Sequence, residues 1–524
     1  MSSGFDTPVA RAVSEAYRRG EEDETMPGLH LVDAAGIPVG CMDDGDYVIF
    51  YNIRGEREVQ LAQSLTQPGF SEFPTKDGMI VHMATMIRYA PGITDHVAFP
   101  PIGAITGTLS EAVSAAGLRQ VKIAESEKAI HLTYFLNGKH PDPWPGEEQV
   151  IIESNREVND FDELPEMNVA DVADAVIDKL ADPAYDLIVA NFANMDVVGH
   201  IEDREAVLSA IRAVDPQVKR VVDSALQAGV TALVTADHGS VEKWYYPEGA
   251  IDTGHTDSPV PFVVCGQGQV QLREGGDLTD IAPTVLSLLG APAPAEMTGK
   301  PLFQAPPGSS GRVLLLIVDG WGLNDDASAN LITQTETPGL DGLLTQFPWV
   351  ALKASGAAAG MPEGTVGNSE AGHLHIGAGR CVPSDRLRIA RAMDSGEYHD
   401  NPAFNWAIDG ALRDGRKLHL LGIISFFSSH GSVKYLEELL RLCARRRVPE
   451  VYVHGLLGRR GERPESGAAY VNDIERLCEE LGTGKFVSVI GRHWALDREQ
   501  HWERVEMAYR LLAFGEGHPV PDRE

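Results

Sequence analysis

Positive charge is scarce in this chain. Its 524 residues include 44 Lys and Arg against 76 Asp and Glu, which gives a formal net charge of −32. Proteins that bind nucleic acid or acidic membranes need a basic face, so we expect neither kind of partner. An anionic small molecule is still compatible with this charge, because a few converging arginines can reverse the local field.

Long apolar runs are missing as well. The longest, Val313 to Val318, is far too short to cross a bilayer, and the first residues, MSSGFDTPVARAVSEAYRRG, lack the apolar core of a secretory leader. The five cysteines are scattered, odd in number and without Cys-x-x-Cys spacing, which indicates reduced thiols. We therefore expect a cytoplasmic protein with no membrane segment. Since no long heptad run is present, we also expect a monomer.

The rest of the composition is that of a globular protein, with 43% hydrophobic and 23% charged residues, and the length predicts two or more domains. Short apolar runs alternate with amphipathic stretches, a rhythm typical of an α/β fold with mainly parallel sheets. A Pro/Gly/Ser segment at 304–311 indicates a linker. The candidate strands are Tyr47–Ile53, Met79–Met83, Asp186–Asn191, Ala232–Ala236, Pro261–Cys265, Arg312–Val318, Leu418–Ile424, Glu450–His454 and Lys485–Ile490.

Metal-type ligands stand just beyond predicted strands in four places, at the edge where sites form in open α/β sheets. A single Asp there is usually a helix cap and a lone His is usually a structural side chain, so their joint occurrence carries the prediction. Mixed carboxylate and imidazole ligands suit Mn²⁺ or Zn²⁺, and this many indicate two ions. The residues are Asp196 with His200, Asp237 with His238, His255, and Asp319.

A glycine-rich segment, Gly364 to His373, surrounds Ser369. Its glycines would allow close approach of a phosphate and a metal ion. A serine hydroxyl becomes a nucleophile when a base or a metal activates it, and a second ion can hold the phosphoryl oxygens. The alternatives are a turn with a capping serine and a phosphate-binding loop, but the Gly-Lys-Ser/Thr of that loop is absent. We therefore predict phosphoryl transfer through a phosphoserine at Ser369.

With these residues assembled, the chain resembles the cofactor-independent phosphoglycerate mutases of the alkaline phosphatase superfamily. The matching stretches are VDGWG, MPEGTVGNSEAGHLHIGAGR, ANFANMDVVGH, TADHG, GHTDSPVP, AFPP, AEMTGK and IAESEK. The resemblance implies two Mn²⁺ ions, or Zn²⁺ as in related enzymes, and no 2,3-bisphosphoglycerate cofactor. It implies that one ion is held by Asp196, His200 and His255, and the other by Asp319, Asp237, His238 and Ser369.

The order of the matching stretches differs from the family's. The strand that usually begins the chain lies at Arg312–Gly322, and the usual carboxyl end lies at Ala295–Phe303. We infer a circular permutation: a transferase domain made of residues 1–100 and 382–524, and an alkaline-phosphatase-like two-metal domain of residues 101–381. Residues near Thr7 and Glu516 are then expected to lie close together in one domain.

The resemblance also implies a set of residues that contact substrate and transferring phosphate. Arginines suit a substrate with a carboxylate and a phosphate, because guanidinium makes bidentate contacts. Lys128 would lie beside the phosphoserine, and it would act in catalysis with Ser369 and the two phosphate-facing arginines, Arg54 and Arg57. The remaining contacts are assigned to His430, Arg460, Arg492 and Arg498.

Two stretches depart from the family pattern. Phe426-Phe427-Ser428 stands where the family has Asp-Gly-Gly, and Gly461 stands where it has an acid that contacts the glycerate hydroxyls. The expected reaction is interconversion of 3-phosphoglycerate and 2-phosphoglycerate or a close analogue. These departures keep open a specialised phosphoryl or phosphonyl transferase acting on a related carboxylic acid, and a phosphatase or phosphodiesterase using the same serine. A non-catalytic relative is disfavoured by the complete set of metal-centre residues.

Overall fold

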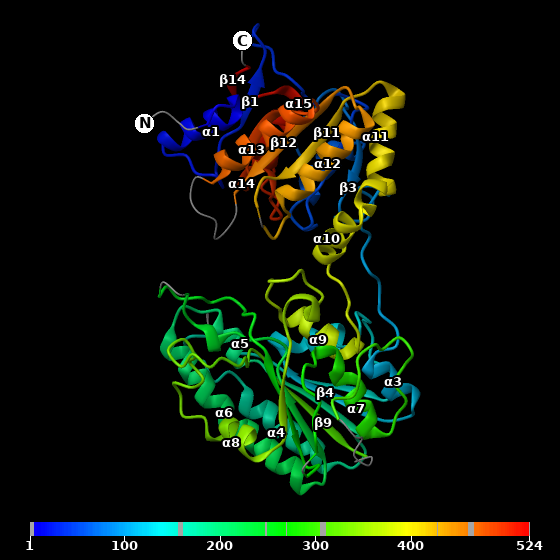
Figure 1. Cartoon of the computed structure of the whole chain (residues 1–524), viewed down its shortest axis with the longest axis vertical. Helices are drawn as coiled ribbons and strands as arrows, with labels where there is room; N and C mark the ends of the chain where they lie inside the picture. The colour runs from blue at the N-terminus through cyan, green and yellow to red at the C-terminus, as the bar shows by residue number, and fades with distance from the viewer. Residues whose placement is uncertain are drawn as a thin grey trace. The chain divides into compact units, whose positions relative to one another are not determined.

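The structure, a computed structural model, describes residues 5–155, 161–246, 249–268, 270–303, 311–426, 428–458 and 466–522. The chain divides into two compact units, Met1–Pro101 with Arg388–Glu524 (unit 1) and Ile102–Leu387 (unit 2). Each unit contains a seven-stranded, mainly parallel sheet with helices, so the predicted α/β class with two domains is confirmed (Figure 1). Residues 304–310 of the expected linker lie outside the described residues.

The sheet of unit 2 has five parallel strands at one side and two strands beyond them. Strand β8 runs antiparallel to both of its neighbours, β7 and β10. Every residue of β6, β7 and β9 is buried, as expected for parallel strands covered on both faces. In spatial order the strands are β10 (Trp349–Leu352), β8 (Val260–Cys265), β7 (Thr231–Thr235), β9 (Val313–Val318), β6 (Leu187–Phe192), β4 (Gln120–Glu125) and β5 (Glu147–Ile152).

Two groups of helices cover this sheet, and Figure 1 shows the strands between them. Helix α6 begins where Asp203 caps its first turn, and Asp215 within it accepts hydrogen bonds from Gly339 N and Leu340 N at the start of α8. One group is α4 (Val169–Ala181), α6 (Arg204–Gln227) and α8 (Pro338–Gln346), and the other is α3 (Leu109–Ala115), α7 (Ile281–Leu289) and α9 (Ser369–Ala378).

The sheet of unit 1 is also buried on both faces. In β2, Tyr47 and Ile49 belong to one apolar cluster, whereas Val48 and Phe50 belong to another. Strand β1 is antiparallel to β13 and parallel to β14. The strands are, in spatial order, β14 (His518–Pro521), β1 (Leu29–Val32), β13 (Lys485–Gly491), β12 (Val451–Leu457), β11 (Leu418–Ile423), β2 (Tyr47–Phe50) and β3 (His82–Thr85).

The first helix and the last strand of the described chain meet in unit 1. The Thr7 hydroxyl donates to Asn472 Oδ1, and the helix that follows Thr7, α1, packs against β14, which follows Glu516. The expectation that these segments lie side by side is therefore confirmed (Figure 1). The helices of unit 1 are α1 (Pro8–Arg18), α2 (Val59–Thr66), α11 (Pro402–Asp414), α12 (Val433–Arg446), α13 (Gly467–Leu481), α14 (Arg492–Ala495) and α15 (Trp502–Phe514), and α10 (Asp385–Ser395) crosses the boundary between the units.

A chain of polar side chains runs through the core of unit 1. Nδ1 of His419 lies 2.9 Å from Nε2 of His454, whose Nδ1 lies 2.7 Å from the Ser488 hydroxyl, and Nε2 of His419 lies 3.2 Å from Asp46 Oδ2. Burial lowers the pKa of His419 and His454, and lowers the pKa of the nearby His30 to about 4. These histidines are therefore neutral at pH 7.

Across the described residues, no helix combines the length and the apolar character that crossing a bilayer requires.

Candidate metal centre

The predicted metal ligands come together at one edge of the unit 2 sheet. Asp319 directly follows β9, and Asp237 and His238 follow β7. Asp196 lies in α5 (Asn194–Gly199), the short helix after β6, and His200 ends that helix. Strands β6, β7 and β9 are parallel neighbours, so their carboxyl ends place these side chains together.

His255 reaches the same edge in a different way. Its sequence context predicts a position just beyond a strand, but His255 lies before β8. Because β8 is antiparallel to β7, the beginning of β8 lies beside the end of β7, and Thr256 N donates to Gly239 O there at 3.0 Å. The expected position relative to a strand is wrong for this residue, yet its imidazole still joins the others.

Ser369 is the first residue of helix α9. Asn368 caps the helix by accepting a hydrogen bond from Ala371 N. The start of a helix favours anions, since its free N–H groups and dipole point at them. The Ser369 hydroxyl is buried, and its Oγ lies 2.7 Å from Lys128 Nζ and 2.9 Å from His238 Nε2.

The glycines around Ser369 make room for the protein's own backbone. A Cβ at Gly372 would lie 2.6 Å from Asp237 O, and one at Gly377 would lie 1.9 Å from Leu136 O. These contacts hold α9 against the segments after β7 and β4. At these two positions the glycines therefore bring the serine to the ligands, rather than leaving space for phosphate and metal as the sequence suggests.

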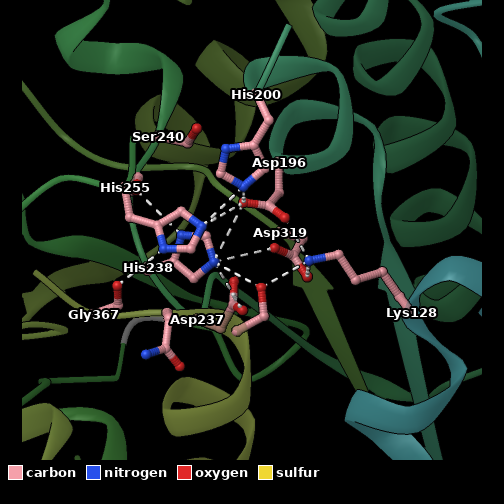
Figure 2. A network of polar contacts seen from close by, with 12 residues as sticks. Lys128, Asp196, His200, Asp237, His238, Ser240, His255, Asp319 and Gly367 are labelled. Carbon is pink, nitrogen blue, oxygen red and sulfur yellow. Dashed lines mark hydrogen bonds and ion pairs between the residues drawn. The ribbon is translucent and has the colours of Figure 1, made fainter. Parts of the chain in front are cut away.

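The first set of expected ligands is compact. Nε2 of His255 lies 3.1 Å from Asp196 Oδ1 and 3.2 Å from His200 Nε2, and the ligand atoms of the three residues lie within 4.8 Å of one another. Figure 2 shows the two imidazoles converging on Asp196 from different loops. The structure thus brings together the residues that the resemblance assigns to one ion.

The second set surrounds His238. Its Nε2 lies 3.4 Å from Asp319 Oδ1, 3.4 Å from Asp237 Oδ2 and 3.6 Å from Asp196 Oδ1. With Ser369 at 2.9 Å, all four residues that the resemblance assigns to the other ion are adjacent.

His373 also belongs to this cluster, although the sequence analysis gives it no role. Its Nδ1 lies 2.9 Å from Ser369 O and 3.2 Å from Asp237 Oδ2. Asn191 Nδ2 lies 3.1 Å from its Nε2 and donates to Asp319 Oδ2 at 2.8 Å. His373 follows Ser369 by four residues, so the spacing alone places both on one face of the helix. That spacing is the signal that would have found it.

The donor set fits divalent cations. Both carboxylate oxygens of Asp237, and Oδ1 of Asp319, are buried and accept no hydrogen bond from a described residue. Burial and the nearby Asp237 charge raise the pKa of Asp319, whereas Asp237 has its pKa held below the ordinary value by His238 and His373 despite its burial. Buried carboxylates among imidazoles are the ligands expected for Mn²⁺ or Zn²⁺.

Lys128 provides the positive charge at this cluster. Its Nζ lies 2.6 Å from Asp196 Oδ2 and 3.0 Å from Asp319 Oδ2 (Figure 2). The same atom lies 2.7 Å from Ser369 Oγ. Burial alone would lower the pKa of the ammonium. The negative charges of Asp319 and Asp196 have the opposite and larger combined effect, so the pKa lies above its ordinary value. Contact with these carboxylates therefore favours the ammonium form of Lys128.

Four of the five arginines expected at the substrate gather in unit 1. Burial and then the charges of Arg498, Arg492 and Arg54 lower the pKa of Arg57, so these three guanidinium groups lie near it. Arg57 and Arg492 line a cavity of about 110 Å³, in which Arg492 Nη2 lies 2.9 Å from Glu24 Oε1. A concentration of positive charge in an acidic chain suits an anionic ligand.

Two stretches depart from the family pattern, and the structure describes some of their residues. Phe426 has 55% of its surface exposed, and Lys434 Nζ lies 5.4 Å from the centre of its ring. Phe427, Arg460 and Gly461 lie outside the described residues. His430, expected at the substrate, is buried, and its Nδ1 lies 2.7 Å from Glu58 Oε1.

Comparison with known proteins identifies the family. A family model described as "Metalloenzyme superfamily" matches residues 18–293, more than half of the chain, and one described as "BPG-independent PGAM N-terminus" matches residues 389–523. The chain belongs to the BPG-independent phosphoglycerate mutase family of the metalloenzyme superfamily. Because the family's amino-terminal part matches the end of this chain, the family's order is permuted here. Superfamily membership and the His and Asp clusters make the chain a metal-dependent enzyme.

Individual members of the family are similar over part of their length. The 2,3-bisphosphoglycerate-independent phosphoglycerate mutase of Ectopseudomonas mendocina is 40% identical over 297 residues, 56% of this chain and 57% of that protein. The corresponding mutase 2 of Methanosarcina acetivorans is 41% identical over 56% of each chain. The match thus spans little more than half the length of these relatives. A Leishmania mexicana phosphoglycerate mutase, solved at low cobalt concentration, shares 29% identity and a TM-score of 0.38 over 52% of this chain and 53% of its own.

Proposed function

We propose that this protein moves a phosphoryl group through Ser369, interconverting 3-phosphoglycerate and 2-phosphoglycerate. The observation that carries the proposal is the position of the buried Ser369 hydroxyl, which contacts Lys128 and His238. These two residues in turn lie beside three buried aspartates. Membership of the phosphoglycerate mutase family supports the choice of substrate. The substrate would be a small phosphorylated carboxylic acid.

Two divalent ions, with Mn²⁺ preferred to Zn²⁺, would favour the deprotonated Ser369 hydroxyl and neutralise the phosphoryl oxygens. One would be held by Asp196, His200 and His255. The other would be held by Asp237, His238, Asp319 and Ser369. Helix α9 places the Ser369 oxygen at this centre beside Lys128 and His238, and the serine itself is buried.

The protein's own cations complete the chemistry. Lys128 would hold its proton and donate hydrogen bonds to the Ser369 oxygen and to the oxygens of the transferring phosphate. In unit 1, Arg54, Arg57, Arg492 and Arg498 would bind the carboxylate and phosphate of the substrate, and His430 and Arg460 would add polar contacts. Arginine suits this role because its donors match both anions in pairs.

The test is direct. Metal-loaded protein is incubated separately with 3-phosphoglycerate and 2-phosphoglycerate, and both are followed by phosphorus NMR. We expect interconversion in the wild type and in a Ser355→Ala control, which alters a serine whose hydroxyl bonds only to Asp257 O among the described residues. The Ser369→Ala variant is expected to show none. A wild type that leaves both compounds unchanged contradicts the proposal, and steady release of inorganic phosphate points to water as the acceptor.

A second candidate is a transferase acting on a related phosphorylated or phosphonylated carboxylic acid. The observation that favours it is Phe426, an exposed aromatic side chain at a position where the family has an aspartate. An aspartate would accept a hydrogen bond from the substrate, whereas a phenylalanine ring would contact an apolar part of the substrate. Screening such acids for transfer that depends on Ser369 separates the two candidates.

A further inference from the structure

A buried glutamate lies next to the segments of unit 2 that carry the expected metal ligands. Glu242 belongs to η3 (Val241–Lys243), a short 3₁₀ helix that follows His238 in the chain. The residue is fully buried, and both of its carboxylate oxygens accept hydrogen bonds, Oε2 from Ser240 N at 2.8 Å and Oε1 from the Thr256 hydroxyl. Glu242 is not one of the expected metal ligands, so this arrangement indicates a supporting role.

The contact with Thr256 fixes the chain at His255, the residue before it. The Thr256 hydroxyl donates its one proton to Glu242, and its oxygen accepts a hydrogen bond from Ser258 N at 3.3 Å. Thr256 N also donates to Gly239 O at 3.0 Å. The side chain and the backbone of Thr256 are therefore both tied to the segment that follows β7, and the backbone that carries His255 is fixed with them.

The contact with Ser240 fixes the same segment against α5. Ser240 is the second residue after His238, and its backbone N–H is the group that bonds to Glu242. A Cβ at Gly199 would lie 2.8 Å from Ser240 Oγ, so the serine packs directly on the end of α5. Gly199 immediately precedes His200. The position of Ser240 therefore affects ligands of both expected sets, His238 of one and His200 of the other.

Two glycines let the backbone pass next to the Glu242 carboxylate. A Cβ at Gly239 would lie 2.5 Å from Glu242 Oε1, and one at Gly322 would lie 2.6 Å from the same oxygen. Gly239 directly follows His238, and Gly322 lies three residues after Asp319. A larger residue at either position would push the carboxylate away. Three segments that carry expected ligands thus meet at this carboxylate, those after β7 and β9 and the one before β8.

We infer that Glu242 is a positioning residue that holds the ligands of both metal ions in place. The inference rests on the two-ion assignment of the proposed function and adds to it the group that sets the ligand geometry. Residues that orient metal ligands without touching the ion change metal affinity by about 10–100-fold when they are replaced. Loss of the carboxylate therefore weakens both ions together, whereas loss of the Thr256 hydroxyl mainly weakens the ion assigned to the set of His255.

The experiment measures metal binding and not turnover. The metal-free full chain is titrated with Mn²⁺, and the electron paramagnetic resonance signal of free Mn²⁺ gives the number of bound ions and their Kd values. We expect two bound ions in the wild type. Glu242→Met keeps the approximate size of the side chain and removes both acceptors, so we expect it to bind both ions about 10–100-fold more weakly.

The Thr256 hydroxyl provides a matched pair of variants. Thr256→Val keeps the shape and removes the donor, and we expect about tenfold weaker binding of one ion. Thr256→Ser keeps the hydroxyl and should restore wild-type binding. Thr284→Val is the control, because Thr284 is another buried threonine of unit 2 whose hydroxyl donates to Asp280 O and accepts from Leu302 N. This change should lower the thermal unfolding midpoint of the metal-free chain and keep both Mn²⁺ affinities.

The outcomes separate the inference from the proposed function. Two bound ions in the wild type with unchanged affinities in either folded Glu242→Met or Thr256→Val overturn the inference and leave the proposed function standing. A loss in Thr256→Val that Thr256→Ser or Thr284→Val shares also overturns it, because the hydroxyl contact is then not the cause. A wild type that binds no Mn²⁺ contradicts the two-ion assignment of the proposed function, and the inference falls with it. If Glu242→Met does not fold, the Thr256 variants alone decide.

Discussion

Lys128 and Ser369 are 241 positions apart in the chain, yet Nζ of the lysine lies 2.7 Å from Oγ of the serine. The lysine follows β4 and the serine begins α9, so the contact depends on the fit of that helix against the sheet edge. The same ammonium touches Asp196 and Asp319. One cation thus joins the nucleophile to the carboxylates that would hold the metal ions.

Replacing this lysine tests the role of its positive charge. In a Lys128→Met variant we expect kcat for 3-phosphoglycerate to fall by about 10²–10³, because charge that develops on the phosphoryl oxygens loses one donor. Lys243→Met is the control, since Lys243 pairs with Asp257 on the surface of the same unit. Steady-state kinetics of the two variants measures the effect, and an unchanged kcat in Lys128→Met would remove the lysine from the mechanism.

Metal removal should destabilise unit 2. The buried carboxylates of Asp237 and Asp319 repel each other, and bound cations relieve that repulsion. A metal at 100 times its Kd adds about 2.7 kcal/mol to the free energy of unfolding. We expect chelation to lower the midpoint of thermal unfolding and Mn²⁺ to restore it. In Asp319→Asn the restoration should be much smaller, and an equal gain in both proteins would place the ions elsewhere.

The packing of α9 gives a prediction on stability. Gly377→Ala puts a Cβ 1.9 Å from Leu136 O, so the helix must shift, and we expect a loss of about 1–3 kcal/mol with weaker metal binding. The matched control is Gly342→Ala in α8, where the nearest atom is the flexible Gln346 amide at 3.3 Å. That change should be neutral or stabilising, because alanine favours helix. Urea unfolding compares them, and equal stabilities would contradict the close packing.

Acid should weaken unit 1 in a defined window. His30 has an ordinary pKa of 6.5 that burial lowers to about 4. Above pH 6.5 His30 is neutral in both the folded and the unfolded chain, so this residue does not reduce the free energy of unfolding there. As the pH falls from 6.5 to about 4, only the unfolded chain takes up the proton, so the free energy of unfolding falls by about 1.4 kcal/mol per pH unit for this group.

The measurement is urea unfolding of wild type, His30→Gln and His518→Gln between pH 7 and pH 4. His30→Gln should show a shallower loss of stability in this range, because the variant no longer takes up that proton on unfolding. His518 is exposed on β14, so its replacement should leave the wild-type slope. Identical slopes in all three proteins would mean that His30 is not the group that titrates.

The metal ligands could be predicted because the strands that precede them are continuous apolar runs in the sequence. The apolar runs of β7 and β9 mark the sheet, and Asp237 and Asp319 stand next to them. The position of His255 relative to its strand could not be predicted, because nothing in the sequence shows that β8 runs antiparallel to β7. The role of His373 depends on which face of α9 meets Asp237, and that face is set by glycine contacts with distant backbone.

Several strands could not be predicted because tertiary contacts, not apolar runs, create them. Strand β4 buries Gln120, Lys122 and Glu125, each with polar partners, so its sequence does not read as a buried strand. The strand expected at Met79–Met83 starts later, because Met79 N donates to Lys76 O and closes a turn with positive φ at Asp77 and Gly78.

The division of the chain has a consequence for its synthesis. Unit 2 is one uninterrupted stretch, Ile102–Leu387, whereas unit 1 is split between the first and last parts of the chain. The strands on either side of β1 in the sheet are β13 and β14, so β1 emerges from the ribosome hundreds of residues before either of them. Unit 2 can fold before the second part of unit 1 has been synthesised. A chain that ends after residue 387 would contain all of unit 2 but would lack β11, β12, β13 and β14 of the unit 1 sheet.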